Sequence, residues 1–342
     1  MILVRAPLRI SFLGGGTDIP SFYHKSPGRV ISATIDKFVY ILINPTPLID
    51  KFTVKYQKTE IVDHPSQLEH TRIKAALQDL GLTDGGIEIG SFADLPAKTG
   101  LGSSSSFSVA LMKGLNTHLN IGKEKKEIAE DACNLEINLL NEPIGKQDQY
   151  AAAFGGFNVF EFNADESVEV EPVLVDYKNK LKLEDHLLLF FTGITRDASS
   201  VLAGQKSNIE KGEHEEIYKK MANSVLDFRE ALLHGDMEKL GKLLHEGWLS
   251  KKQLANNITN KEIDGLYDTA LDVGAWGGKV LGAGGGGCLM ILAPEDKHNN
   301  IRKRMIEYAN STNREGFREI PIRFSEAGAG ILFSNKFIHR FT

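Results

Sequence analysis

The sequence predicts an α+β protein built as two domains. Short β-branched runs and amphipathic helical runs are mixed along both halves of the chain, which is typical of α+β architecture. A chain of 342 residues is long enough for two separate cores. The stretch over residues 163–185 is acidic and irregular. We therefore place the boundary there, and expect an N-terminal domain over 1–175 and a C-terminal domain over 176–342.

The strands and helices of the N-terminal half follow from apolar periods. Phe107, Leu111 and Leu115 recur every four residues after a serine run, which predicts an amphipathic helix. The alternation of polar and apolar residues over 51–58 predicts a strand with one solvent-exposed face. On such patterns we expect strands over 1–12, 30–44, 51–58, 87–92 and 156–162, and helices over 66–80, 103–119 and 123–141.

The C-terminal half repeats the mixture with more helix. Residues 208–272 are largely helical in pattern, and a glycine cluster then leads into an apolar strand. We expect helices over 217–233, 237–254 and 297–309, and strands over 187–191, 288–293, 320–324 and 329–333.

Composition and charge narrow the class of protein. A net charge of -5 disfavours a general nucleic-acid binder, whose affinity comes mostly from Lys and Arg neutralising phosphates. Cys133 and Cys288 lie far apart and show neither a disulfide framework nor zinc-ligand spacing. No signal-peptide pattern opens the sequence, and no apolar run approaches the ~18 residues of a membrane span. We expect a cytoplasmic protein with no membrane or nucleic-acid partner; the sequence does not indicate its oligomeric state.

Glycine is the one unusual residue type. It makes up 33 of the 342 residues, above the ~7% that is usual in proteins. Many of these glycines cluster at 14–16, 100–102, 155–156 and 277–287. Clusters inside otherwise structured sequence indicate backbone that closely approaches a ligand or another segment.

The segment PAKTGLGSSSS (96–106) predicts an anion-binding site at the start of a helix. A helix N-terminus presents unpaired N–H groups and about half a positive charge, which suits phosphate oxygens. The alternative is a flexible loop that ends in a capping serine, but one serine would suffice for a cap and this segment has four. The Gly-Lys-Ser/Thr ending of a Walker A loop is absent.

The glycine run GAGGGG (282–287) is not a dinucleotide fingerprint. It precedes a strand, whereas that fingerprint must follow a strand and open a helix. We interpret it as a loop packed against another part of the chain.

Three segments taken together resemble the motifs of the GHMP kinase superfamily. They are APLRISFLGGGTD (6–18), PAKTGLGSSSS (96–106) and KVLGAGGGGC (279–288), in the family's order and at its spacing. The strings LRISFLGGGTD (8–18), GKQDQYAAAFGG (145–156) and TGITRDAS (192–199) are most similar to its heptose 7-phosphate kinase group. Galactokinases have Gly-Glu-His before the Thr-Asp, so the glycines at 14–16 lack two side chains that contact galactose.

The resemblance implies the fold and the catalytic pair. The N-terminal domain would be like ribosomal protein S5 domain 2, the C-terminal domain ferredoxin-like, and the active site would lie between them. Asp148, in KQDQY (146–150), matches the catalytic aspartate that orients the acceptor hydroxyl and takes its proton. Arg9 matches the basic residue that holds this aspartate ionised and stabilises charge on the transferred phosphoryl group.

Glu136 is a candidate metal ligand. On the helix over 123–141 it falls on the flank of the apolar face, beside Leu139, where an unpartnered carboxylate is costly. The resemblance supplies Mg²⁺ as the partner, held by Glu136 and by Ser104, in keeping with the few protein oxygens that Mg²⁺ prefers. The alternative is an amphipathic glutamate that pairs with a nearby lysine.

The resemblance also implies binding residues for ATP and for the sugar. The ATP phosphates would lie on the second segment, at Pro96, Gly100, Leu101, Gly102, Ser103, Ser104 and Ser105. The sugar would be bound by Thr17, Asp18, Arg196, Gly284 and Gly285. Two alternatives stay open: Thr17 caps a tight turn of the glycines before it, and Arg196 is a surface loop residue paired with Asp197.

The implied function is ATP- and Mg²⁺-dependent phosphorylation of a small sugar phosphate. The acceptor would be the anomeric hydroxyl of D-glycero-D-manno-heptose 7-phosphate, and the 1,7-bisphosphate would serve nucleotide-activated heptose synthesis. The alternatives are another sugar 1-kinase similar to L-fucokinase, and a catalytically silent sugar sensor on the same fold. Arg9, Ser104, Glu136 and Asp148 are all present, which argues against the silent protein.

Overall fold

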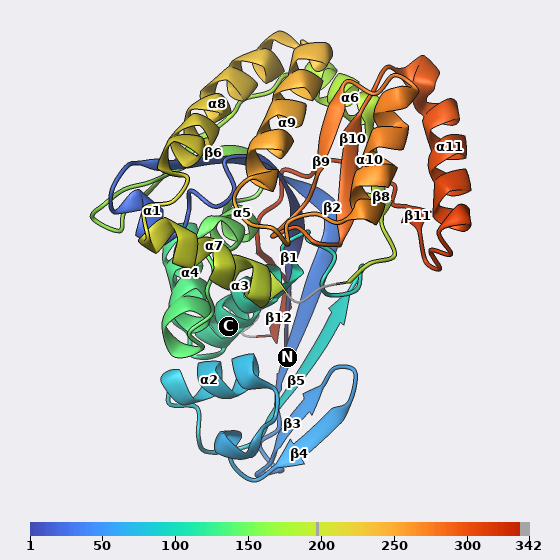
Figure 1. Ribbon diagram of the computed structural model, residues 1–342. Helices are drawn as coiled ribbons and strands as arrows, with labels where there is room; N and C mark the ends of the chain where they lie inside the picture. Colours follow the sequence, from blue (N-terminus) through green and yellow to red (C-terminus); the bar gives the residue numbers. More distant parts are fainter. Residues whose placement is uncertain (196–197, 336–342) are drawn as a thin grey trace.

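Two β-sheets, each covered by helices, organise the fold (Figure 1). The computed structural model describes residues 1–195 and 198–335, apart from the side chains of residues 198–200. None of the helices within these described ranges is long and apolar enough to cross a membrane.

The first sheet has eight strands around the long strand β2. Its order is β12-β1-β2-β5-β3-β4, and β6 and β7 continue from β2. The strands are β1 (Ile2–Leu13), β2 (Gly28–Pro45), β3 (Phe52–Lys55), β4 (Thr59–Val62), β5 (Ile87–Ala93), β6 (Phe157–Phe162), β7 (Val168–Pro172) and β12 (Gly330–Ser334). The β1–β2 register shifts between Pro7 and Arg9. Such a bulge re-aims the side chains next to it.

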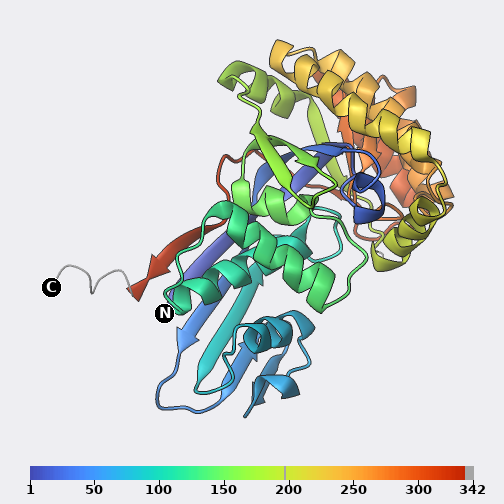
Figure 2. The same ribbon diagram turned by 90° about the vertical axis from the view of Figure 1, so that its left-hand side faces the viewer.

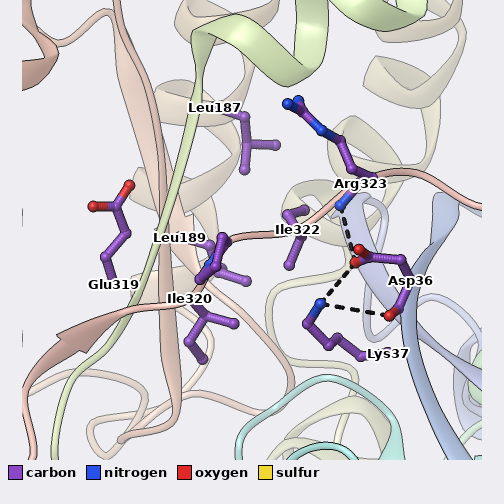
Figure 3. A pocket seen from close by; sticks show the side chains of 9 residues that line it. Asp36, Lys37, Leu187, Leu189, Glu319, Ile320, Ile322 and Arg323 are labelled. Atoms are coloured by element: carbon purple, nitrogen blue, oxygen red, sulfur yellow. Dashed lines mark hydrogen bonds and ion pairs between the residues drawn. The ribbon is translucent and has the colours of Figure 1, made fainter.

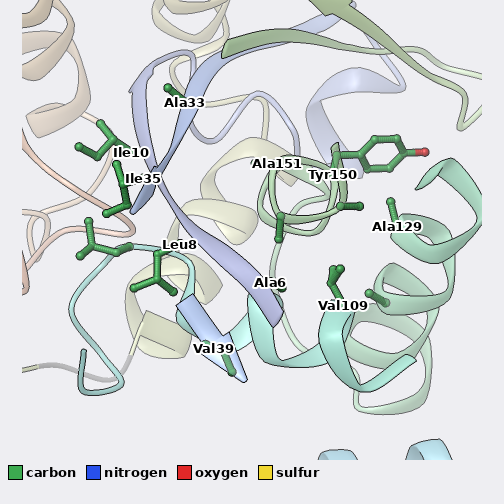
Figure 4. Close-up of a cluster of buried hydrophobic side chains, with 14 of the residues drawn as sticks. Ala6, Leu8, Ile10, Ala33, Ile35, Val39, Val109, Ala129, Tyr150 and Ala151 are labelled. Carbon is green, nitrogen blue, oxygen red and sulfur yellow. The ribbon is translucent and has the colours of Figure 1, made fainter. Parts of the chain in front are cut away.

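Four helical segments cover one face of the first sheet. They are α2 (Thr71–Asp79), α3 (Ser103–His118), α4 (Lys125–Cys133) with the π-helical Asn134–Leu139, and α5 (Gln147–Phe154). Figure 4 shows the core that they form with β1 and β2, in which Leu8, Val39, Val109 and Tyr150 are buried. Gly114 lets α3 approach the sheet, because a Cβ there would lie 2.7 Å from Ile43 Cδ1.

The second sheet is antiparallel, with the order β11-β8-β10-β9. Its strands are β8 (Leu187–Phe191), β9 (Gly277–Val280), β10 (Cys288–Leu292) and β11 (Arg318–Glu319). The helices of this half are α6 (Tyr177–His186), α7 (Ala198–Glu210), α8 (Glu215–His234), α9 (Met237–Lys252), α10 (Lys261–Asp272) and α11 (His298–Ser311). Pro20–Tyr23 forms the short helix α1. Helix α8 packs on β2 and helix α9 on β1, so the two halves are in contact.

The predicted α+β class is confirmed, and four local predictions differ from the structure. The strand predicted over 320–324 is not formed: β11 ends at Glu319, and an isolated bridge joins Phe324 to Ile35. Residues 51–58 form one arm and the turn of the β3–β4 hairpin rather than one strand, with the Tyr56 N–H donating to the Lys58 carbonyl (2.9 Å). The predicted helix over 123–141 becomes π-helical after Cys133. The stretch 163–185 contains β7 and most of α6. The sequence did not predict α6, because Leu183 is its one buried residue and a single apolar position shows no helical period.

The end of the described chain returns to the first sheet. Strand β12 pairs antiparallel with β1, and Figure 2 shows it extending beside the N-terminal strands. The expected boundary at residue 175 falls between β7 and α6. The division into 1–175 and 176–342 stays a prediction.

Candidate active site

The N-terminus of α3 carries no side-chain cap. Its N-cap residue is Gly102, in the left-handed conformation (φ 76°), and the first helical bond runs from Ser106 N–H to the Gly102 carbonyl (2.9 Å). The N–H groups of Ser103, Ser104 and Ser105 precede that bond, and such groups suit an anion. The geometry fits the anion site that the sequence predicts, and the role of these residues as ATP ligands stays a prediction.

The four serines of this segment divide by environment. Ser104 is exposed and Ser103 half-buried at the helix N-terminus, whereas Ser105 and Ser106 are buried. The Ser106 hydroxyl donates to the Pro7 carbonyl (2.7 Å) and ties α3 to β1. Half of the serine run is therefore free for a ligand, and the other half holds the helix in place.

Arg9 and Asp148 form a bidentate ion pair beside this helix N-terminus. Arg9 Nε donates to Asp148 Oδ1 (2.8 Å) and Nη2 to Oδ2 (2.7 Å), while Nη1 donates to the Gly100 carbonyl (2.7 Å). The Arg9 side chain is 4% exposed and that of Asp148 25%. A Cβ on Gly102 would lie 3.2 Å from Arg9 Cγ, so the glycine makes room for the arginine. The predicted pair is thus assembled, with the aspartate open to an acceptor.

The third glycine-rich segment packs on the second. A Cβ on Gly100 would lie 2.5 Å from the Leu281 carbonyl oxygen, and Cys288 N–H donates to the Thr99 carbonyl (2.9 Å). Gly284 and Gly285 are buried, and Gly285 N–H is bonded to the Ile258 carbonyl (2.7 Å). This arrangement agrees with a loop packed on another segment and gives no support to sugar binding by these two glycines. In the same glycine-rich segment, Gly282 and Ala283 are half-buried.

Asp18 and Thr17 close the first glycine turn. The buried Thr17 hydroxyl lies 2.8 Å from the Gly14 carbonyl oxygen and accepts from Arg29 N–H (3.0 Å), which is the turn-capping role left open by the sequence. Asp18 Oδ1 accepts from Gly16 N–H (2.9 Å) and from Gln147 Nε2 (2.9 Å). Burial raises the pKa of the Asp18 carboxyl, and the nearby charge of Asp148 raises it further. The hydrogen bonds from Gly16 and Gln147 lower this pKa but do not offset the rise. Asp18 therefore links the glycine turn to the helix that carries Asp148.

Gly145 allows this close approach. A Cβ at Gly145 would lie 2.1 Å from Asp18 Oδ2, so a side chain there would displace the carboxylate. The glycine that opens the GKQDQ string therefore serves the position of Asp18.

Glu136 is the centre of a buried polar cluster. Its carboxylate is fully buried and accepts from Ser105 Oγ (2.8 Å), Ser108 Oγ (2.9 Å) and Gln149 Nε2 (2.6 Å). Arg72 Nε donates to it at 3.3 Å. The π-helical turn places Glu136 deeper than the predicted flank, while Leu139 is 40% exposed. No hydrogen bond is recorded between Glu136 and Ser104, while the adjacent Ser105 bonds to the carboxylate, so the pairing of Glu136 and Ser104 as Mg²⁺ ligands stays a prediction.

Two buried lysines were missed from the sequence. Lys251, at the end of α9, donates to the Gly282 carbonyl (2.5 Å), and Lys279, in β9, donates to the Ser11 and Phe12 carbonyls (3.0 and 2.9 Å). Lys251 continues the apolar stripe of Leu244 and Trp248 at a spacing of four and then three residues. A lysine on a buried stripe is the signal that could have revealed it.

The site draws on both halves of the chain, and it is separate from a cavity nearer the second sheet. A cavity of about 290 Å³ lies between β2 and the segment after β11 (Figure 3). In its lining, Asp36 accepts from Lys37 Nζ (3.0 Å) and from the backbone N–H of Arg323 (3.0 Å), and none of the lining residues belongs to the three glycine-rich motifs. The predicted phosphate ligand Arg196 and its neighbour Asp197 lie outside the described residues.

The sequence matches two family models. The GHMP kinases N terminal domain matches residues 70–156, and the GHMP kinases C terminal domain matches residues 228–311. The D-glycero-alpha-D-manno-heptose 7-phosphate kinase of Campylobacter jejuni is 30% identical over 318 residues, which cover 89% of this chain and 93% of that protein. The L-fucokinase/L-fucose-1-P guanylyltransferase of Bacteroides fragilis is 27% identical over 95% of this chain and 38% of its own length.

The fold has a similar solved structure. The crystal structure of a D-glycero-D-manno-heptose 1-phosphate kinase from Bacteroides thetaiotaomicron superposes with a TM-score of 0.77 at 28% identity, covering 98% of this chain and 99% of that one. The similarity extends over both sheets and all three glycine-rich segments.

Proposed function

Because the chain belongs to the GHMP kinase family and is a sugar kinase, we propose that it phosphorylates the anomeric hydroxyl of D-glycero-D-manno-heptose 7-phosphate. Kinases of this family use ATP as the phosphate donor. The product is the 1,7-bisphosphate, for nucleotide-activated heptose synthesis. The Campylobacter relative supports the proposal, because it is named for this substrate and the match covers 93% of its length.

The ion pair of Arg9 and Asp148 is the observation that carries the chemistry. Two hydrogen bonds to Arg9 fix the carboxylate at the N-terminus of α5, and its partial exposure leaves it open to a hydroxyl. Asp148 orients that hydroxyl and accepts its proton as the new bond forms. Phosphoryl transfer depends more on positioning and charge stabilisation than on a strong base, and a fixed carboxylate beside a guanidinium meets this need.

The N-terminus of α3 is the proposed site of the ATP phosphates. Its uncapped N–H groups and the exposed Ser104 hydroxyl supply donors for phosphate oxygens. The acceptor oxygen bonds to the γ-phosphorus, and the bond from that phosphorus to the β,γ-bridging oxygen breaks. The phosphorylated sugar and ADP are the products, and the hydroxyl proton leaves through Asp148.

Mg²⁺ is proposed at Glu136 and Ser104. A carboxylate among hydroxyl groups is the hard oxygen chemistry that Mg²⁺ prefers, and a serine hydroxyl can turn from donating to accepting. The donors from Ser105, Ser108, Gln149 and Arg72 already surround Glu136, so binding there requires one of them to withdraw. When bound, Mg²⁺ neutralises charge on the ATP phosphates.

Replacing the proposed ligands should raise the Mg²⁺ concentration needed for half-maximal activity. We expect this in both Glu136→Gln and Ser104→Ala, measured by titrating Mg²⁺ at saturating ATP and sugar. Glu136→Gln should also lower the melting temperature, because Arg72 and the serine donors lose a charged acceptor. An unchanged Mg²⁺ midpoint in both variants would make Glu136 a purely structural centre.

The acceptor site is proposed beside the first glycine turn. Asp18 links this turn to the helix of Asp148, and at Gly15 a Cβ would lie 3.7 Å from Gln147 Nε2. Arg196 remains the proposed ligand of the 7-phosphate, because its planar fork matches a phosphate with two parallel hydrogen bonds. Thr17, Gly284 and Gly285 have weaker support, since their polar groups or backbone contact protein.

A substrate panel tests the proposal. ADP release is measured with heptose 7-phosphate, heptose 1-phosphate, free heptose, L-fucose and galactose, in the parent and in Arg196→Met. We expect the highest kcat/KM for heptose 7-phosphate in the parent. Arg196→Met should raise the KM for that sugar about 10- to 150-fold, which corresponds to the free energy of one hydrogen bond to a charged group. The KM for ATP should stay nearly constant.

The panel also separates the alternatives. A preference for L-fucose or another unphosphorylated sugar would contradict the heptose assignment but not the kinase activity. Similarity to the Bacteroides fragilis relative favours L-fucose as the second candidate substrate. Release of ADP with none of the sugars would contradict the heptose proposal altogether. Parallel rises in both KM values would remove Arg196 as the phosphate ligand.

A further inference from the structure

Lys251 is a buried cation that lacks a carboxylate partner in the described part of the chain. It is 5% exposed, and no Asp or Glu oxygen of residues 1–195 or 198–335 forms an ion pair with it. A buried charge is costly unless it is paired or bonded to further groups. The placement of this lysine therefore needs an explanation.

The ammonium lies close to the catalytic pair. Its hydrogen bond goes to the carbonyl of Gly282, and a Cβ on Gly282 would lie 2.8 Å from Gly100 Cα. The carbonyl of Gly100 in turn accepts from Arg9 Nη1 (2.7 Å). Lys251 thus reaches, through two backbone contacts, the place where the second and third glycine-rich segments meet Arg9.

Lys251 is a cation at neutral pH, because its pKa is lowered only to about 8. Burial is the main cause of the lowered pKa and the charge of Arg9 adds to it, whereas the charges of Asp18 and Asp148 oppose it. Lys279 also faces Lys251, and burial and these neighbouring cations lower the pKa of Lys279 well below its usual range. Among the described residues, Lys279 has two carbonyl acceptors, whereas Lys251 has one for its three N–H groups.

The positive charge of Arg9 is already neutralised by the Asp148 carboxylate. Its Nε and Nη2 are bonded to Asp148 and its Nη1 to the Gly100 carbonyl, so the pair of side chains carries no net charge. A phosphoryl group undergoing transfer carries negative charge on its equatorial oxygens and needs an uncompensated cation. Neither of the two buried lysines near this pair is ion-paired to a described carboxylate, and Lys251 has fewer described acceptors than Lys279.

We infer that Lys251 binds the γ-phosphoryl group of ATP and stabilises its charge during transfer. The lysine keeps its proton throughout and donates hydrogen bonds to phosphoryl oxygens, while the acceptor oxygen replaces the β,γ-bridging oxygen on phosphorus. This inference depends on the sugar-kinase activity but not on which sugar is the acceptor. It adds a residue of the C-terminal half to the site.

The test compares nucleotides with and without a γ-phosphate, in the absence of sugar. Kd values for AMP-PNP and for ADP are measured calorimetrically at fixed Mg²⁺, in the parent and in Lys251→Met. We expect the variant to weaken AMP-PNP binding about 10- to 150-fold, as for a lost charged hydrogen bond, and to change ADP binding less than about twofold. The control is Lys252→Met, which removes the adjacent lysine paired with Asp264 (3.3 Å) and should leave both Kd values unchanged.

The opposing explanation is that Lys251 only stabilises the glycine loop by its hydrogen bond to Gly282. Loss of such a stabilising contact would weaken the binding of ADP and AMP-PNP equally, and it would lower the melting temperature of the nucleotide-free protein. Our inference expects that melting temperature to be unchanged or higher, because methionine removes a buried unpaired charge. Equal losses for both nucleotides, no loss for either, or an unfolded variant would each overturn it.

Discussion

Asp148→Asn should lower kcat by about 10²–10⁴, the contribution of a positioned acid–base group. Asparagine keeps one oxygen as an acceptor for Arg9, but its amide cannot take the hydroxyl proton, and its N–H groups oppose the guanidinium. ATP binding should change little, because the proposed phosphate donors lie on α3 rather than on α5. Steady-state kinetics with a separate nucleotide Kd measurement distinguishes the two effects.

Asp131 provides a matched control for this substitution. Its side chain is 21% exposed, close to the 25% of Asp148, and it is ion-paired to Lys123 (2.6 Å) outside the site. Asp131→Asn should leave kcat at the level of the parent. A rate for Asp148→Asn within threefold of the parent would show that another group activates the acceptor.

Local sequence features predicted much of the site. The glycines before the serine run predicted a backbone that approaches a ligand, and the structure has an uncapped helix N-terminus there with Arg9 packed against Gly102. The proposed catalytic pair came from matching Arg9 and Asp148 to a family, because 139 residues separate them and no local pattern joins them. The strand that carries Arg9 and the helix that carries Asp148 meet only in the folded protein.

The errors arose where long-range contacts decide the outcome. Glu136 was predicted at the flank of a regular helix, but the π-helical turn buries it against serines of α3 and Arg72 of α2. Lys279 was missed because its partners are backbone carbonyls of a distant strand, which carry no sequence signal, whereas Lys251 lies on the apolar stripe of Leu244 and Trp248. Strand β12 was predicted over 329–333, but its pairing with β1 from the opposite end of the chain was not.

Arg9→Met is expected to have the second large effect, a loss of about 10²–10³ in kcat. This is the usual cost of removing one donor to charge that develops in the transition state. The variant also frees the Asp148 carboxylate from two hydrogen bonds and leaves the Gly100 carbonyl without its arginine donor. Arg9→Lys should recover part of the rate, because lysine restores the charge but not the planar fork.

Arg5 is the control on the same strand. It lies four residues before Arg9 on β1, with its guanidinium 4.4 Å from the centre of the Phe38 ring, and contacts neither Asp148 nor Gly100. Arg5→Met should leave kcat unchanged. Equal rates for Arg9→Met and Arg5→Met would remove Arg9 from the chemistry.

The double variant tests whether Arg9 and Asp148 act as one unit. Residues that act together lose their function together, so removing the second costs little after the first is gone. We expect Arg9→Met/Asp148→Asn to be less than about tenfold slower than Asp148→Asn alone. Two fully additive losses would mean that Arg9 acts on the phosphoryl group independently of the carboxylate. In that case the shared hydrogen bonds at 2.7 and 2.8 Å would serve the structure rather than the reaction.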